Sequence, residues 1–184
     1  IDRPIVSGTM LGEVARDRLV RTGGAQDGDS IVVTKGIAIE GTALLARERA
    51  DDLRKAGVSD DTITLSAELL SNPGISVLTD ARIASTNAQI HSMHDVTEGG
   101  LITGLREIAA ASGLGLAIEE GSVPILESTA AVCQALDLDP LGLLASGALL
   151  ITLPSSDVPY LIFSLEKRGI DCWEIGIMVA PEEG

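Results

Sequence analysis

Residues 89–113 read QIHSMHDVTEGGLITGLREIAAASG, and this stretch contains the alternation that decides the fold class. The range 89–93 has the composition of a short strand, and from Gly99 onward apolar residues recur at helical spacing. Gly113 follows the last periodic residues, where a glycine commonly ends a helix in the left-handed conformation. The stretch therefore predicts a strand, a glycine-rich turn and an amphipathic helix.

The same alternation continues on both sides of this stretch. Further strands are predicted at 29–34, 114–119, 148–153 and 172–179, with one or two more in 4–21, and helices at 39–56, 59–70, 75–86, 128–136 and 157–168. Strands and helices alternate without strict βαβ regularity. We therefore expect an α+β fold, a layered domain with a central mixed β-sheet packed by helices.

Composition and charge exclude several classes of partner. The chain has 184 residues, which suits one domain, and its net charge of −14 would repel a nucleic-acid backbone or an anionic membrane. Aromatic residues make up only 2%, so surfaces for base stacking are scarce. No apolar run reaches the roughly 18 residues of a membrane span. We expect no nucleic acid, no membrane and, with Cys133 and Cys172 as two buried thiols, a cytoplasmic location.

The two histidines of the chain, His91 and His94, raise the question of a metal site. On a strand, residues three apart point to opposite faces, and a zinc site usually needs at least three protein ligands. No further Cys or His set is available to complete one, so we expect no metal bound by these residues. A catalytic His94 stays open, although the sequence offers no GxSxG elbow or nearby cysteine as its nucleophile.

The glycine pair Gly99-Gly100 predicts an anion site. Glycines let a backbone approach a ligand closely, and the first N–H groups of a helix point toward it with the positive end of the helix dipole. The alternative is helix capping, by Asp95 with Glu98 in a capping box or by Thr97 one register later. The two acids argue against a bare phosphate unless Mg²⁺ or a cationic group intervenes.

Two other turns have simple alternatives to a ligand role. Lys35-Gly36 lies at another predicted junction of strand and helix, where the lysine could pair with a phosphate, but an exposed lysine is the default interpretation. There is no Walker A loop and no GxGxxG fingerprint. Ser146-Gly147 precedes a predicted strand and is equally well explained as a turn.

Taken together, several segments resemble the carboxy-terminal domain of the aminoimidazole ribonucleotide synthetase (PurM-like) superfamily. Within it, the likeness is greatest to the hydrogenase maturation factor HypE and HypE-like relatives. The matching segments, in the order of the superfamily, are IVSGTMLGEV (5–14), GDSIVVTKGIAIEGTALLARE (28–48), NPGISV (72–77), MHDVTEGGLITGLREIAAASG (93–113) and LDPLGLLASGALLI (138–151).

The resemblance implies an ATP-dependent, HypE-like protein that activates an oxygen by phosphoryl transfer in hydrogenase maturation. ATP and Mg²⁺ would belong mainly to a preceding N-terminal domain, with none bound tightly by this chain alone. Residues 1–184 would form the C-terminal domain that covers the active site, with 1–28 leading in from the ATP-binding domain. The full-length protein would form a homodimer and act on a small-molecule or protein substrate.

By position, the resemblance also implies site residues. The expected phosphate- or substrate-binding residues are Asp95, Thr97, Glu98, Gly99, Gly100, Lys35, Ser146 and Gly147, and the catalytic candidates are His94 and Glu98. We expect Gly100→Val to abolish the activity of the full-length protein and to leave the fold largely intact.

The sequence departs from the family at its end. The dehydration chemistry of HypE uses a carboxy-terminal cysteine, whereas this sequence ends in PEEG and Cys172 lies within a predicted strand. Unless residues were trimmed, we expect a HypE-like relative acting on another substrate. The first residue is Ile1 rather than Met, which favours a piece of a longer protein. The alternative function is a non-catalytic binding or scaffold module recognising a metabolite or a protein.

Overall fold

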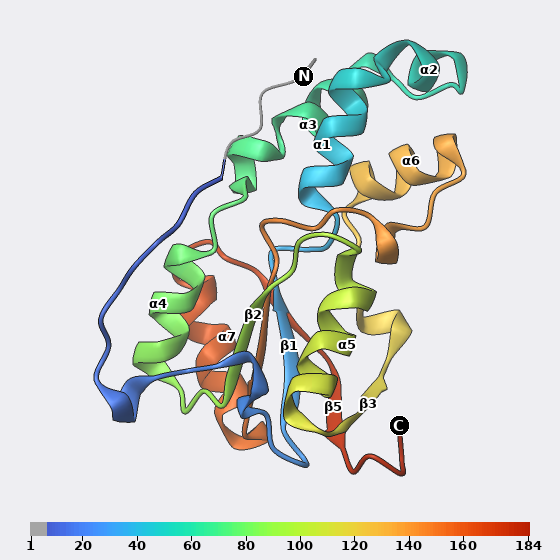
Figure 1. The fold of residues 1–184 in the computed structure, drawn as a ribbon. Coiled ribbons are helices and arrows are strands. Elements are labelled where there is room, and N and C mark those ends of the chain that lie inside the picture. Colours follow the sequence, from blue (N-terminus) through green and yellow to red (C-terminus); the bar gives the residue numbers. More distant parts are fainter. Residues whose placement is uncertain (1–6) are drawn as a thin grey trace.

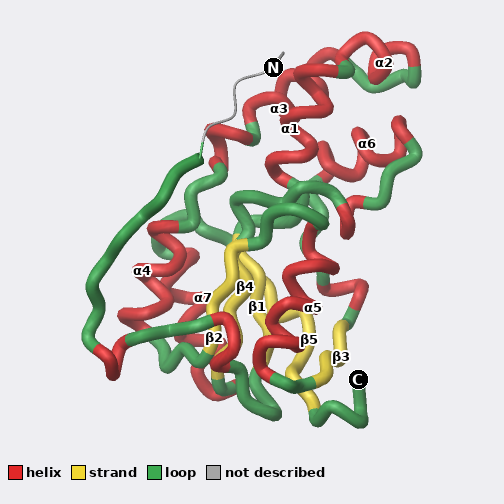
Figure 2. Tube along the Cα trace, viewed as in Figure 1, coloured by secondary structure: helices red, strands yellow, loops and turns green. Residues whose placement is uncertain are grey.

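The computed structural model describes residues 7–184, and its centre is strand β1 (Ser30–Thr34), which is buried along its whole length. β1 lies in the middle of a five-stranded sheet with the order β2-β4-β1-β5-β3 (Figures 1 and 2). The other strands are β2 (Ser92–Asp95), β3 (Gly115–Ile118), β4 (Leu149–Leu153) and β5 (Cys172–Val179). The α+β layered fold is confirmed.

The expected mixture of parallel and antiparallel strands is wrong, because all four strand pairings in the described residues are antiparallel. The order of the strands explains this result. β1, β2 and β3 run in one direction, as their helical crossovers require, but β4 and β5 run the other way and lie between them. β4 and β5, which come last in the chain, thus lie between β1, β2 and β3 and keep these three parallel strands from pairing with one another.

Helices cover both faces of the sheet (Figure 1). Ile31 and Val33 of β1 pack with Leu101, Leu105 and Ile108 of α5 (Gly100–Ser112) in one core. Val32 points to the other face and packs with α4 (Leu78–Asn87) and α7 (Val158–Glu166). This alternation along β1 follows from the two-residue period of a strand.

A helical cluster stands beyond one end of the sheet (Figure 1). It consists of α1 (Ile39–Glu48), α2 (Ala50–Lys55), α3 (Asp60–Glu68) and α6 (Glu127–Leu136), around a small core that includes Leu53 and Val132. The single helix predicted over 39–56 is interrupted at Arg49, whose φ of −123° lies outside the helical range. α3 begins after Ser59, as the sequence predicts.

The strands predicted within 4–21 are absent from the part of that range that the structure describes, and Pro4 to Val6 lie outside the described residues. Residues 7–21 contain a short 3-10 turn, Arg16–Arg18, and a second turn, Thr22–Gly24, follows. The apolar residues of this segment find no core: Met10 and Leu11 are 96% and 91% exposed. The edge of the sheet at β2 is contacted instead by Thr22, whose carbonyl accepts from Ser92 Oγ.

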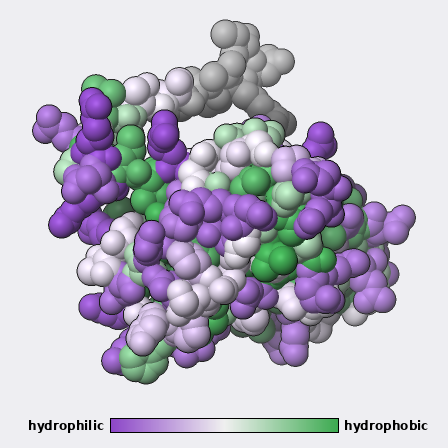
Figure 3. Space-filling model, turned by 90° about the horizontal axis from the view of Figure 1, so that it is seen from below, coloured by the Kyte–Doolittle hydropathy of each residue, from purple (hydrophilic) through white to green (hydrophobic). Residues whose placement is uncertain are grey.

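Three further observations bear on function. Cys133 and Cys172 are both buried and unpaired, as expected. Between residues 7 and 184, no helix combines the length and apolar character needed to cross a bilayer. The end of the molecule opposite the helical cluster presents mostly hydrophilic residues with some hydrophobic areas among them (Figure 3).

Candidate functional site

The loop between β2 and α5 contains the glycine pair of the sequence. Gly99 is the residue before the helix and has a φ of 76°, and Gly100 has a φ of 65°, so both lie in the left-handed region that favours glycine. No side chain among residues 7–184 caps this helix. The capping interpretation with Asp95, Thr97 and Glu98 is therefore wrong, and no side chain competes for the first N–H groups of α5.

Gly100 is also required by packing. A Cβ atom on it would lie 2.4 Å from the carbonyl oxygen of Leu141 and 2.7 Å from that of Leu143. Because both obstacles are backbone atoms, they cannot move aside as a flexible side chain would. The expectation that Gly100→Val leaves the fold largely intact is therefore wrong.

The loops that carry the expected site residues form one continuous set of contacts. Ala145 N donates to Thr97 O at 3.2 Å, which places the Ser146-Gly147 turn beside the glycine-pair loop. A Cβ on Gly147 would meet Gly74 O at 3.0 Å, so this turn also touches the loop after α3. These loops follow the ends of β1 and β2 and precede β4, so they lie at one end of the sheet, between the sheet and the helical cluster.

Lys35 is buried, not exposed, and it has two acceptors within the protein. Its Nζ donates to Ser76 O at 2.8 Å and lies 3.2 Å from Asp80 Oδ1. Thr34 Oγ1 donates to the same Asp80 oxygen at 2.7 Å. The ammonium thus fastens the loop before α4 to the end of the central strand.

Asp80 and Thr34 were missed by the sequence reasoning, although one signal pointed to Asp80. It lies four residues before Ala84 on the buried face of α4, a position where an apolar residue is typical. An acid at such a position indicates a buried partner.

The two histidines contact different carboxylates. His94 Nε2 lies 2.6 Å from Glu107 Oε2 on α5, and His91 Nδ1 lies 2.9 Å from both oxygens of Asp29, just before β1. They therefore do not share a ligand site. Among the described residues, no group of three or more His, Cys, Asp or Glu could hold a metal ion.

The solvent-facing part of this end of the sheet is acidic. Asp95, Thr97, Glu98 and Gly99 are exposed, whereas Gly100 and Gly147 are buried in the turns that shape it. Asp95 and Glu98 form no ion pair with any described residue. Gly100 N donates to Thr97 O and Thr103 N donates to Gly99 O, so a ligand can use only the other N–H groups of the first turn of α5. Two free carboxylates beside them suit a Mg²⁺-bound phosphate, because Mg²⁺ typically takes one or two carboxylates and completes its shell with phosphate and water.

Cys172 lies at the same end of the sheet but is not a nucleophile at neutral pH. It pairs with Thr34 in the register of β1 and β5. Burial, with smaller contributions from the negative charges of Glu166, Asp171 and Asp80, raises the pKa of its thiol to about 12. Its neutral side chain packs in the core with α4 and α7.

Comparison with known proteins agrees with this architecture. The chain is 28% identical over 157 residues to a putative hydrogenase expression/formation protein of Methanocaldococcus jannaschii, covering 85% of this chain and 43% of that protein. It is 29% identical over 167 residues to the carbamoyl dehydratase HypE of Cupriavidus necator, covering 89% of this chain and 43% of the relative. The chain thus spans less than half the length of both relatives.

Solved structures share the fold. E. coli HypE superimposes with a TM-score of 0.70 at 22% identity, over 87% of this chain and 46% of that one. A HypE in complex with ATP gives 0.66 at 24% identity, over 92% of this chain and 48% of that one, and a HypE–HypF complex gives 0.61 at 21% identity, over 87% and 49%. The model of the AIR synthase related protein family, C-terminal domain, matches residues 26–184. The chain belongs to this family, as its C-terminal domain.

Proposed function

We propose that this chain is the C-terminal half of an ATP-dependent, HypE-like protein that activates an oxygen atom by phosphoryl transfer in hydrogenase maturation. The observation that carries the proposal is the arrangement at one end of the sheet, where the glycine-pair loop, the Ser146-Gly147 turn and the uncapped start of α5 lie together. The relatives named above are hydrogenase maturation proteins, and one HypE structure holds ATP.

In this proposal, the residues of the site divide into two groups. The N–H groups of Leu101 and Ile102, in the first turn of α5, receive the phosphate or the activated oxygen, and Asp95 and Glu98 bind the Mg²⁺ that accompanies the nucleotide. Gly99, Gly100 and Gly147 shape the turns, and Thr97 and Ser146 offer hydroxyl groups at the solvent side. Lys35 holds the neighbouring loop in position, because its ammonium group already has two protein acceptors.

His94 is the candidate for proton transfer. Its imidazole is oriented by Glu107 at 2.6 Å, an arrangement in which a carboxylate fixes the ring of a histidine that moves protons. Glu98 is the alternative, since it is exposed on the glycine-pair loop. Bound Mg²⁺ would neutralise the phosphate charge, and the chain's own residues would orient the reacting oxygen and accept its proton.

We further propose that residues 1–28 lead in from an N-terminal ATP-binding domain, and that the complete protein is a cytoplasmic homodimer acting on a small-molecule or protein substrate. The buried free thiols support a reducing compartment. The solved complex of HypE with HypF supports a protein partner.

The test is ATP turnover by the complete protein with both carboxylates neutralised. We expect the double variant Asp95→Asn and Glu98→Gln to lose turnover and to need far more Mg²⁺ for what remains. The control is Glu182→Gln with Glu183→Gln, which removes the same charge from the exposed C-terminal residues. Equal turnover and equal Mg²⁺ dependence in the two double variants would refute the assignment of the site.

A non-catalytic scaffold has a different signature in the same assay. It would bind nucleotide and turn over none in the wild-type protein, whichever carboxylates are present. That outcome would replace the enzymatic proposal with the binding one.

A further inference from the structure

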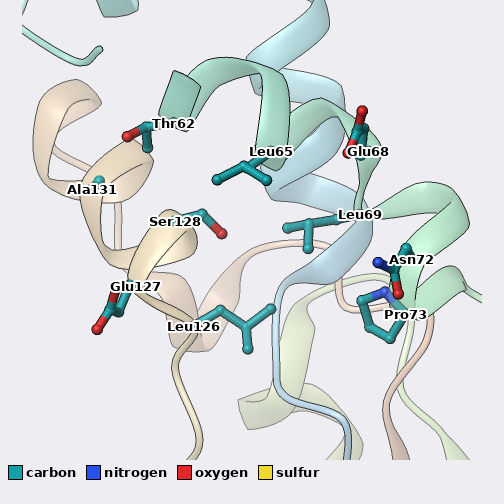
Figure 4. A pocket seen from close by; sticks show the side chains of 10 residues that line it. All are labelled: Thr62, Leu65, Glu68, Leu69, Asn72, Pro73, Leu126, Glu127, Ser128 and Ala131. Carbon is teal, nitrogen blue, oxygen red and sulfur yellow. The ribbon is translucent and has the colours of Figure 1, made fainter. Parts of the chain in front are cut away.

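An open groove lies in the helical cluster, between α3, the turn at Asn72-Pro73 and the start of α6 (Figure 4). Its volume is about 620 Å³. The side chains of Leu65 in α3, Leu69 at the end of α3 and Leu126 before α6 point toward its centre, as does the hydroxyl of Ser128 (Figure 4). The groove therefore has a floor of three leucines and a rim that includes the polar or charged residues Thr62, Glu68, Asn72, Glu127 and Ser128. None of its lining residues belongs to the proposed nucleotide site.

The apolar floor is incompletely covered. Leu65 is 61% exposed on a helix whose inward positions are filled by Ile63 and Ser66. Leu69 is buried and packs with Ile39 of α1, so the floor rests on a packed core and is preformed. Covering the exposed leucine with another apolar side chain would remove its surface from water, which is favourable.

The charges around the groove determine which residues a bound segment can carry on either side of its apolar side chain. Glu68 and Glu127 are exposed and lie on opposite sides of the floor (Figure 4). None of the ten described lining residues is basic, and the chain as a whole carries a net charge of −14. A segment entering here meets one carboxylate on each side of the leucine floor, so basic flanks are complementary and acidic flanks are repelled.

We propose that this groove docks a partner protein through a short segment with one apolar anchor side chain between basic residues. The anchor covers Leu65, Leu69 and Leu126, and the basic residues pair with Glu68 and Glu127. A few buried anchor residues carry most of the affinity of such contacts, while rim charges set selectivity and the rate of encounter. A short peptide with one apolar side chain between basic residues should therefore bind the groove, but weakly.

The probe is the peptide acetyl-Ala-Lys-Leu-Arg-Ala-amide, titrated into the ¹⁵N-labelled chain of 184 residues and followed by amide chemical shifts. We expect saturable shifts confined to residues 62–73 and 126–131. Replacing the peptide's leucine by serine, or Leu65 of the protein by serine, should weaken binding about tenfold, the effect of losing roughly 1.4 kcal/mol of contact. Glu68→Gln with Glu127→Gln should weaken it several-fold and remove most of its salt dependence.

Matched controls separate the groove from general surface effects. Leu44→Ser changes another half-exposed leucine, on α1, and Glu182→Gln with Glu183→Gln removes two charges elsewhere. Both control variants should bind the peptide like the wild type. The proposal is overturned by shifts centred outside the groove, by equal binding of the serine peptide, or by an equal loss of binding in the control variants.

Discussion

At the scale of a single residue, Gly100 belongs both to the expected site and to the packing that holds the fold together. Both its positive φ and the carbonyl groups of Leu141 and Leu143 exclude a side chain. We expect Gly100→Ala to lower the free energy of unfolding by about 2–5 kcal/mol, the sum of a left-handed backbone cost and of overpacking. Urea denaturation measures this change in the free energy of unfolding.

The control is Gly113→Ala, because Gly113 has a similar φ of 68° but nothing within 4 Å of its Cβ position. Gly113→Ala should lower the free energy of unfolding by only about 1–2 kcal/mol, the cost of placing a side chain on a left-handed backbone. Equal destabilisation by the two variants would show that the contact with residues 141–143 contributes nothing.

Asp80 is the buried counter-ion of Lys35. Removing it in Asp80→Ala leaves the ammonium group buried without a charged partner, which typically costs about 3–5 kcal/mol. Asp52→Ala breaks an ion pair with Arg49 that is exposed on both sides, so it should leave the free energy of unfolding nearly unchanged. Chemical denaturation of the two variants decides whether the buried pair matters, and a small effect at Asp80 would argue against it.

The raised pKa of the Cys172 thiol predicts that the protein becomes less stable at alkaline pH. The unfolded thiol ionises near its ordinary pKa of 9.0, whereas the folded thiol ionises only near a pKa of about 12. Between these values the folded state holds a proton that the unfolded state has lost, so the free energy of unfolding falls as pH rises. Denaturation across this window should show a smaller decrease for Cys172→Ala than for the wild type. Parallel curves would contradict the raised pKa.

At the scale of elements, the start of α3 depends on one cap. Ser59 Oγ accepts from Thr62 N at 3.1 Å. We expect Ser59→Ala to cost about 1 kcal/mol of unfolding free energy. Replacing the exposed Ser71 by alanine should cost much less, and urea denaturation of both variants is the measurement. No difference between them would rule out the cap as a stabilising contact.

Four of the five strands could be predicted from the sequence to within one residue at each end, and the edge strand β2 was the exception. β1 and β5 lie where the sequence places them: β1 is buried along its whole length, and β5 is a run rich in apolar residues. β2 begins at Ser92, three residues later than predicted. Gln89 N donates to the side chain of Asp157 instead, and His91 donates its N–H to Thr152 of β4 while its ring contacts Asp29.

The sequence predicts where the turns of the site lie, but it does not predict which of these turns contact one another. Glycine pairs and Ser-Gly pairs mark changes of chain direction within a few residues of sequence. The contact of Thr97 with Ala145 and that of Lys35 with Asp80 join segments more than 40 residues apart. Such pairings are set by the strand order of the whole sheet, which local periodicity does not contain.

At the scale of the whole molecule, the interleaved sheet explains how distant segments form one site. Because β1 and β2 run in the same direction, the loops that follow them leave from the same end of the sheet, and the turn before β4 arrives there from the opposite direction. The helical cluster stands over this end and supplies the groove. Ligand site and docking groove are thus neighbours that share the loop after α3, which lines the groove with Asn72 and Pro73 and meets the turn at Gly147 through Gly74.

The measurement that most directly tests the central claim is calorimetric titration of ATP with Mg²⁺ into two proteins. One is this chain of 184 residues, and the other is the same chain preceded by the N-terminal domain that we propose. The account predicts Mg²⁺-dependent binding by the longer protein and no tight binding by the shorter one. Tight binding by the 184-residue chain alone, or none by the longer protein, would contradict it.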